Sequence, residues 1–175
     1  MFGDKPEKPL LRSSAKPGDF VYLAAETGLS LCGYKALKKG VNGFEKSKES
    51  FLYPDPFLHI PSKINELNAA IDISDSLLSE LRLLCALSNV SITINADKIP
   101  VHEEVKLGSG IFSIPLLNLL FGSGEEFIML FSADHKIEGA FEIGRVTDKP
   151  GQKLEIIYKN SVVDADSIKL FSHFG

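Results

Sequence analysis

The spacing of hydrophobic positions along the chain changes between the two-residue period of strands and the longer period of helices. Apolar side chains recur at helical spacing over residues 28–39, where Gly40 is expected to end the helix, and a leucine-rich helix is expected after Asp75. Strands are predicted over 20–25, 69–73, 90–95, 126–132, 139–147 and 153–158. Because these elements are mixed without strict alternation, we predict an α+β fold, a mixed α/β sandwich, in one domain over 1–175.

Between the periodic segments the pattern is weaker. Residues 40–50 are loop-like and carry charges of both signs. Counted together with the preceding residues, lysines 35, 38, 39, 46 and 48 outnumber Glu45 and Glu49, which favours a solvated loop, or alternatively a rim that attracts phosphate. Pro54 and Pro56 are expected to open a helix that reaches Leu67.

Composition restricts the partners. The chain has 175 residues, 44% of them hydrophobic and 24% charged, with a formal net charge of −4, which argues against a general affinity for nucleic acid or anionic membranes. The start of the chain is polar, and no apolar stretch approaches the ~20 residues of a membrane span, so we expect a cytoplasmic protein. Cys32 and Cys85 are expected to be packed thiols in a reducing compartment.

The segment Ile71-Asp72-Ile73-Ser74-Asp75 carries the most chemistry. Alternation along a strand directs Asp72 and Ser74 to one face and the two isoleucines to the other, while Asp75 lies at the turn into the next helix. Two carboxylates and a hydroxyl beside a helix amino terminus suit Mg²⁺ and a phosphate group. The alternative is that Ser74 or Asp75 only caps the helix and that Asp72 is a solvated strand end.

A second candidate lies at residues 122–127, where two glycines precede Glu125 at the start of a predicted strand. Glycines allow backbone to approach a ligand closely, but a plain turn has the same composition. Neither this stretch nor residues 108–110 fits a dinucleotide fingerprint or a P-loop. The four histidines have no metal-ligand spacing, so no zinc site is predicted.

Six stretches of the chain resemble motifs of the thiamine-monophosphate kinase family, in the family's own order. Residues 70–77 (A-I-D-I-S-D-S-L) resemble A-x-D-I-S-D-G-L, residues 124–131 (G-E-E-F-I-M-L-F) resemble G-G-E-D-Y-E-L-L-F, and residues 12–19 (R-S-S-A-K-P-G-D) resemble R-S-G-A-K-P-G-D. Residues 53–56, 143–147 and 173–174 are similar to the family's R-P-x-P, I-G-x-V and terminal H-F. Each match is weak alone, but their shared order is specific to the family's carboxy-terminal domain.

The resemblance implies a fold like the carboxy-terminal domain of aminoimidazole-ribonucleotide synthetase, with helices packed on a mixed sheet. It implies transfer of the γ-phosphoryl group of ATP to thiamine phosphate, giving thiamine diphosphate. In this scheme Asp72 and Asp75 would bind Mg²⁺, Arg12 and Ser74 would contact ATP, and Glu125 would contact thiamine phosphate. The acceptor is an ionised phosphate, so no catalytic base is nominated.

Three departures from the family pattern bear on the activity. The glycine after the second motif aspartate is Ser76, a further family aspartate falls on Leu29, and an aromatic residue that packs on the substrate falls on Ile168. The resemblance also implies a missing amino-terminal domain as a partner in cis or in trans, and a homodimer as a further candidate assembly. The alternatives are a degenerate module that binds nucleotide or phosphate without turnover, and a related ATP-dependent synthetase.

Overall fold

The computed structural model describes residues 9–55, 61–149, 151 and 153–171. In this part of the chain seven strands form one sheet in the order β2-β4-β1-β5-β3-β6-β7. Neighbouring strands run antiparallel except β3 and β6, which are parallel. The strands are β1 Phe20–Leu23, β2 Ala69–Asp72, β3 Ser91–Asn95, β4 Met129–Ala133, β5 Phe141–Thr147, β6 Leu154–Tyr158 and β7 Ser161–Val163.

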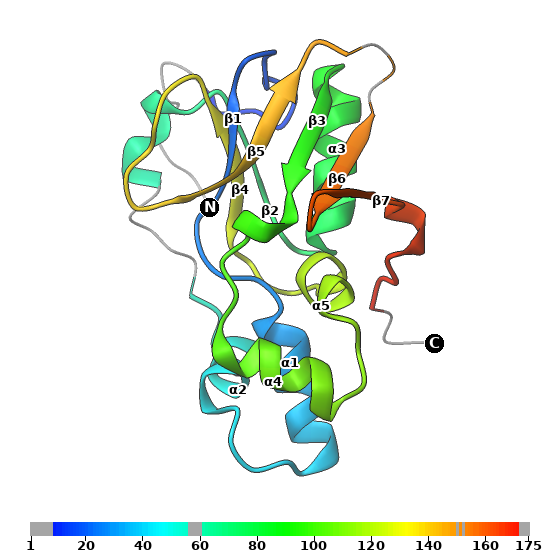
Figure 1. The fold of residues 1–175 in the computed structure, drawn as a ribbon. Coiled ribbons are helices and arrows are strands. Elements are labelled where there is room, and N and C mark those ends of the chain that lie inside the picture. Colours follow the sequence, from blue (N-terminus) through cyan, green and yellow to red (C-terminus); the bar gives the residue numbers. More distant parts are fainter. Residues whose placement is uncertain (1–8, 56–60, 150, 152, 172–175) are drawn as a thin grey trace.

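Five α-helices accompany the sheet, in two groups (Figure 1). Helix α3 packs along strands β2, β3 and β6, whereas α1, α2 and α4 pack on one another beyond the end of the sheet, with α5 in contact with both α3 and α4. The helices are α1 Leu29–Lys39, α2 Glu45–Leu52, α3 Leu77–Ser88, α4 Glu103–Ile111 and α5 Leu116–Gly122. This arrangement confirms the predicted α+β fold.

The main hydrophobic core lies between the sheet and the helices. It includes the fully buried leucines of α3 together with Ile92, Ile94 and Ile156 of the central strands. A smaller cluster on the other face of the sheet is built on Tyr22 and Phe131, whose rings stack with centroids 5.3 Å apart. Each strand at the centre of the sheet is therefore covered on at least one face.

The predicted strands and the helices α1 and α3 are confirmed to within a few residues, but two predictions near the first third of the chain are wrong. Residues 45–52 form α2 and not a loop, because Glu104 of α4 accepts hydrogen bonds from the backbone and hydroxyl of Ser47 at 2.7 and 2.6 Å and from the Lys46 amide at 3.1 Å. A short 3₁₀ turn, Pro61–Glu66, takes the place of the expected helix up to Leu67. Residues 56–60 lie outside the described part of the chain.

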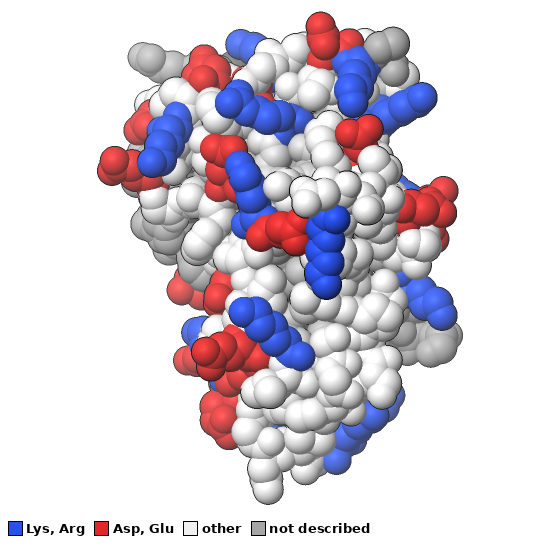
Figure 2. All heavy atoms as spheres, viewed as in Figure 1, with Lys and Arg blue, Asp and Glu red and all other residues white. Residues whose placement is uncertain are grey.

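Both cysteines are buried and unpaired, as expected. Burial raises the pKa of the Cys32 thiol to about 12 and that of Cys85 to about 11, so both remain protonated at neutral pH. Among the residues that the structure describes, every helix falls short of the length and apolarity needed to cross a bilayer. Acidic and basic side chains are interspersed over the upper part of the face shown in Figure 2, and its lower part carries fewer charges.

Candidate functional site

The two segments singled out in the sequence lie against each other. Strands β2 and β4 pair antiparallel up to Asp72 and Met129, and the pairing continues beyond both strand ends. The Ile73 amide donates to the Ile128 carbonyl at 2.9 Å, and the Phe127 amide donates back to the Ile73 carbonyl at 2.9 Å. One step further, the Glu125 amide donates to the Ser74 carbonyl at 2.7 Å. The acidic turn and the glycine-containing turn thus form one unit.

Gly124 permits this close approach. A Cβ atom at this position would lie 2.4 Å from the Asp75 carbonyl oxygen, a distance that backbone cannot accommodate without moving. Two residues that follow Gly124 in the sequence, Glu125 and Phe127, adopt left-handed backbone conformations with φ of 56° and 53°. Such conformations cost of order 1 kcal/mol or more for residues other than glycine and persist only where surrounding contacts enforce them.

The alternation predicted along β2 is present. Ile71 and Ile73 are buried, whereas Asp72 and Asp75 are exposed and Ser74 is half-buried. The expected capping role of Ser74 or Asp75 is wrong, because the hydroxyl of Ser76 accepts the Ser79 amide at 3.1 Å and caps α3. No lysine, arginine or histidine in the described part of the chain forms an ion pair with either aspartate.

A cavity of about 360 Å³ opens beside this unit. Ser74, Asp75 and Glu125 line it together with Gly124, and the segment Leu170-Phe171 closes its far wall. Three of the five predicted site residues therefore share one cavity. Asp72 and Arg12 do not line it, although both act electrostatically on the residue that follows the lining residue Ser79 in the sequence.

That residue is Glu80, which lies in the first turn of α3 and is only 4% exposed. Burial raises the pKa of the Glu80 carboxyl, the negative charges of Asp75 and Asp72 raise it further, and a hydrogen bond from the Asp75 backbone and the charge of Arg12 lower it. Asp72, Asp75 and Arg12 are thus close enough to Glu80 to affect its ionisation. The pattern of the sequence did not predict this residue, although a glutamate among the apolar positions of an amphipathic helix was a visible signal.

The neighbour of Glu125 was also missed. Glu126 is 3% exposed, and its carboxylate accepts the amide of Gly28 at 2.8 Å, the amide of Ser30 at 3.5 Å and the hydroxyl of Ser123 at 2.5 Å. Gly28 has no side chain with which to cap α1, so Glu126 supplies the cap from 98 residues away. Burial raises the pKa of Glu126 to about 7, although these hydrogen bonds favour its charged form.

The donor set suits magnesium to a limited extent. The described residues contain no group of three or more acidic, histidine or cysteine side chains placed to hold a metal. Two exposed carboxylates beside a hydroxyl can still serve Mg²⁺, which commonly takes one or two carboxylates and completes its shell with water and phosphate oxygens. His173 and Phe174 of the terminal motif lie outside the described part of the chain.

No protein-family model matches the chain. The thiamine-monophosphate kinase of Pyrococcus horikoshii is 38% identical to it over 148 residues, and the match covers 81% of this chain and 47% of that protein. The structure of thiamine monophosphate kinase from Aquifex aeolicus superposes with a TM-score of 0.77 at 25% identity, covering 91% of this chain and 56% of the other. A structure of AaThiL complexed with AMPPCP and TMP gives a TM-score of 0.74 at 24% identity, covering 89% of this chain and 52% of that one.

The fold is therefore the α+β domain found in these kinase structures, with helices packed on a mixed sheet. In sequence the chain is similar to the carboxy-terminal part of thiamine-monophosphate kinase, which confirms the resemblance carried by its motifs. The chain spans about half the length of the curated relatives it matches.

The contact at Gly124 can be tested by adding one methyl group. We expect Gly124→Ala to lower the free energy of unfolding by roughly 1–3 kcal/mol, because the new Cβ meets the Asp75 carbonyl and forces the two turns apart. Urea unfolding measures the change. Gly110→Ala is the matched control, since its added Cβ has no neighbour within 4 Å outside the adjacent residues and the backbone of its own helix, and alanine favours a helix. Equal stability of Gly124→Ala and wild type would contradict the proposed contact.

The buried carboxyl of Glu126 predicts a dependence of stability on pH. Because its pKa is raised from 4.5 to about 7, the folded protein binds a proton that the unfolded chain has already released between these values. Stability should therefore fall as pH rises through this window, by about 3 kcal/mol. The variant Glu126→Gln should lack this component, so that the difference between wild type and variant changes across the window.

Urea unfolding between pH 4 and 8 measures the effect, with Glu103→Gln as a control at an exposed carboxylate. Glu80, whose pKa is also raised, is present in both proteins, so its contribution cancels in the difference between them. A constant difference between wild type and Glu126→Gln over the whole range would show that Glu126 is not the titrating group.

Proposed function

We propose that this chain supplies the carboxy-terminal half of a thiamine-monophosphate kinase, which transfers the γ-phosphoryl group of ATP to thiamine phosphate. The observation that carries the proposal is the joining of two motif segments, 72–75 and 124–127, by backbone hydrogen bonds around one cavity. The relative from P. horikoshii is named for this activity, and the neighbouring AaThiL structure is described as complexed with AMPPCP and TMP.

Electrostatics explains the residue types in the proposed site. Donor and acceptor are both anionic, and two like charges 4 Å apart repel by about 4 kcal/mol at an effective dielectric constant of 20. Asp72 and Asp75, exposed and without ion pairs in the described part of the chain, would hold Mg²⁺. When bound, the ion would offset this repulsion and orient the phosphate groups.

Other residues of the chain would position the reactants. Ser74 would contact ATP from the wall of the cavity, and Arg12 would contact it from beside Glu80. Glu125, held in left-handed backbone and also lining the cavity, would contact thiamine phosphate. No side chain is assigned as a base, because the attacking phosphate oxygen is already ionised. The rest of the site would come from the family's amino-terminal half, in cis or in trans.

A degenerate module that binds nucleotide without turnover is the second candidate. Ser76 does not favour it, because this serine has extended backbone and caps α3, so glycine is not required there. Leu29 and Ile168 do favour it, because they are 5% and 6% exposed and place apolar side chains where the family has an aspartate and an aromatic residue. With isoleucine at position 168, the stacking of an aromatic side chain on the thiamine ring would be lost.

Reconstitution separates the two candidates. The chain is mixed with the amino-terminal half of the P. horikoshii relative, and formation of thiamine diphosphate from ATP, Mg²⁺ and thiamine phosphate is measured. We expect product only when both halves are present, and a loss of activity on the order of 100-fold in Asp72→Asn or Asp75→Asn. Asp148→Asn, which removes an equal charge from an exposed position at the end of β5, is the control.

Calorimetry with ATP and Mg²⁺ accompanies the assay. Binding without product at any ratio of the two halves would support the non-catalytic module and reject the kinase. Binding of equal strength in the double variant Asp72→Asn plus Asp75→Asn would reject this pair as metal ligands.

A further inference from the structure

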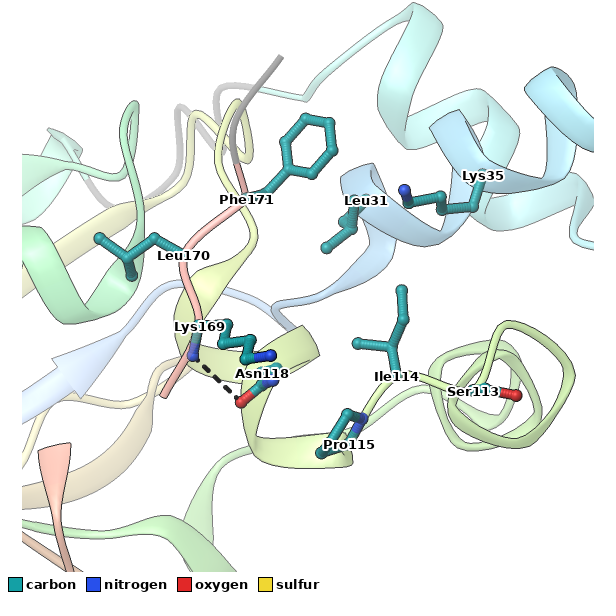
Figure 3. Close-up of a pocket in the computed structure, with 9 residues that line it drawn as sticks. All are labelled: Leu31, Lys35, Ser113, Ile114, Pro115, Asn118, Lys169, Leu170 and Phe171. Carbon is teal, nitrogen blue, oxygen red and sulfur yellow. Dashed lines mark hydrogen bonds between the residues drawn. The ribbon is translucent and has the colours of Figure 1, made fainter. Parts of the chain in front are cut away.

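A second cavity, of about 300 Å³, lies on the other side of the Leu170-Phe171 segment (Figure 3). Leu31 of α1 and the connection between α4 and α5, including Ile114, form its apolar walls, and the two residues of the shared segment close it. Leu170 and Phe171 thus separate it from the cavity that holds Asp75 and Glu125. Its volume is at the lower end of the range for small-molecule sites.

The charges lining the two cavities have opposite sign. Asp75 and Glu125 line the first, whereas among the described residues the charged side chains lining the second are Lys35 and Lys169. Figure 3 shows the two lysine side chains extending toward the space from opposite walls. In the described part of the chain neither ammonium group forms an ion pair with a carboxylate.

Local contacts hold both lysines at the cavity. The ammonium nitrogen of Lys35 lies 5.3 Å from the centroid of the Phe171 ring and 5.7 Å from that of Tyr34, within the range of cation–π attraction. The backbone amide of Lys169 donates to the side-chain oxygen of Asn118 at 3.3 Å. The cavity therefore combines apolar walls, an aromatic ring and two positive charges.

We propose that this cavity binds a small organic anion with an aromatic or apolar body and one carboxylate or phosphate group. The body would replace water against Leu31, Ile114 and Phe171, and the anionic group would lie between Lys35 and Lys169. This cavity is separate from the proposed phosphate-transfer site, so the proposal does not depend on the kinase activity.

Binding to the whole chain tests the proposal, with phenyl phosphate and benzoate as the two probes. Affinities are measured by calorimetry, and amide chemical shifts of α1 and α5 report the location. We expect Lys35→Met and Lys169→Met each to weaken binding roughly 5- to 10-fold, as expected for loss of one charge-assisted contact. Benzyl alcohol, which has the ring without the charge, and inorganic phosphate, which has the charge without the ring, should both bind more weakly.

Lys106→Met removes an exposed charge from α4 outside the cavity and should leave affinity unchanged. Circular dichroism checks that each variant folds, and Lys35→Gln and Lys169→Gln replace any methionine variant that does not. Full affinity in the double lysine variant would overturn the proposal, as would equal binding of inorganic phosphate and phenyl phosphate. Loss of binding in Glu125→Gln would also overturn it, because the anion would then lie in the first cavity.

Discussion

The candidate site depends on backbone hydrogen bonds that join two turns about fifty residues apart in the chain. The antiparallel ladder of β2 and β4 does not stop where the strands end, because Ile73 and Ser74 continue to pair with Ile128, Phe127 and Glu125. Backbone pairing fixes position more tightly than contacts between exposed side chains, because few torsions remain free. Ser74 and Glu125 are therefore brought to one cavity by the sheet itself.

Two glutamates cap helices that lie far from them in the sequence. Glu126 caps α1 through the amides of Gly28 and Ser30, and Glu104 caps α2 through Ser47 and Lys46. Partial burial raises the pKa of Glu104, but hydrogen bonds from Ser47 and Lys46 outweigh it and lower the pKa overall, whereas complete burial dominates at Glu126. Glu126 therefore connects the loop of Glu125 to α1, and a change at either end would be felt at the other.

These distant caps explain which elements the sequence could predict. Local signals identified β2 and α3, where alternating isoleucines and a leucine-rich face specify the element without outside help. Phe44, the residue before helix α2, provides no side-chain cap, and the carboxylate that replaces it belongs to Glu104, 57 positions beyond Ser47. No local rule predicts such a partner. The same limitation hid Glu126, although the motif around Glu125 was recognised.

The carboxylates of Asp72, Asp75 and Glu80 provide the strongest physical argument for a bound cation. Burial is the main cause of the raised pKa of Glu80, and the charges of Asp75 and Asp72 raise it further. The negative charges of these carboxylates therefore repel one another even without a ligand. Arg12 is the positive charge that acts on Glu80 in the opposite direction. An ATP phosphate entering beside Ser74 would meet this same field. The proposed transfer therefore requires a divalent ion at these carboxylates, whereas the neighbouring lysine-lined cavity can accept an anion without one.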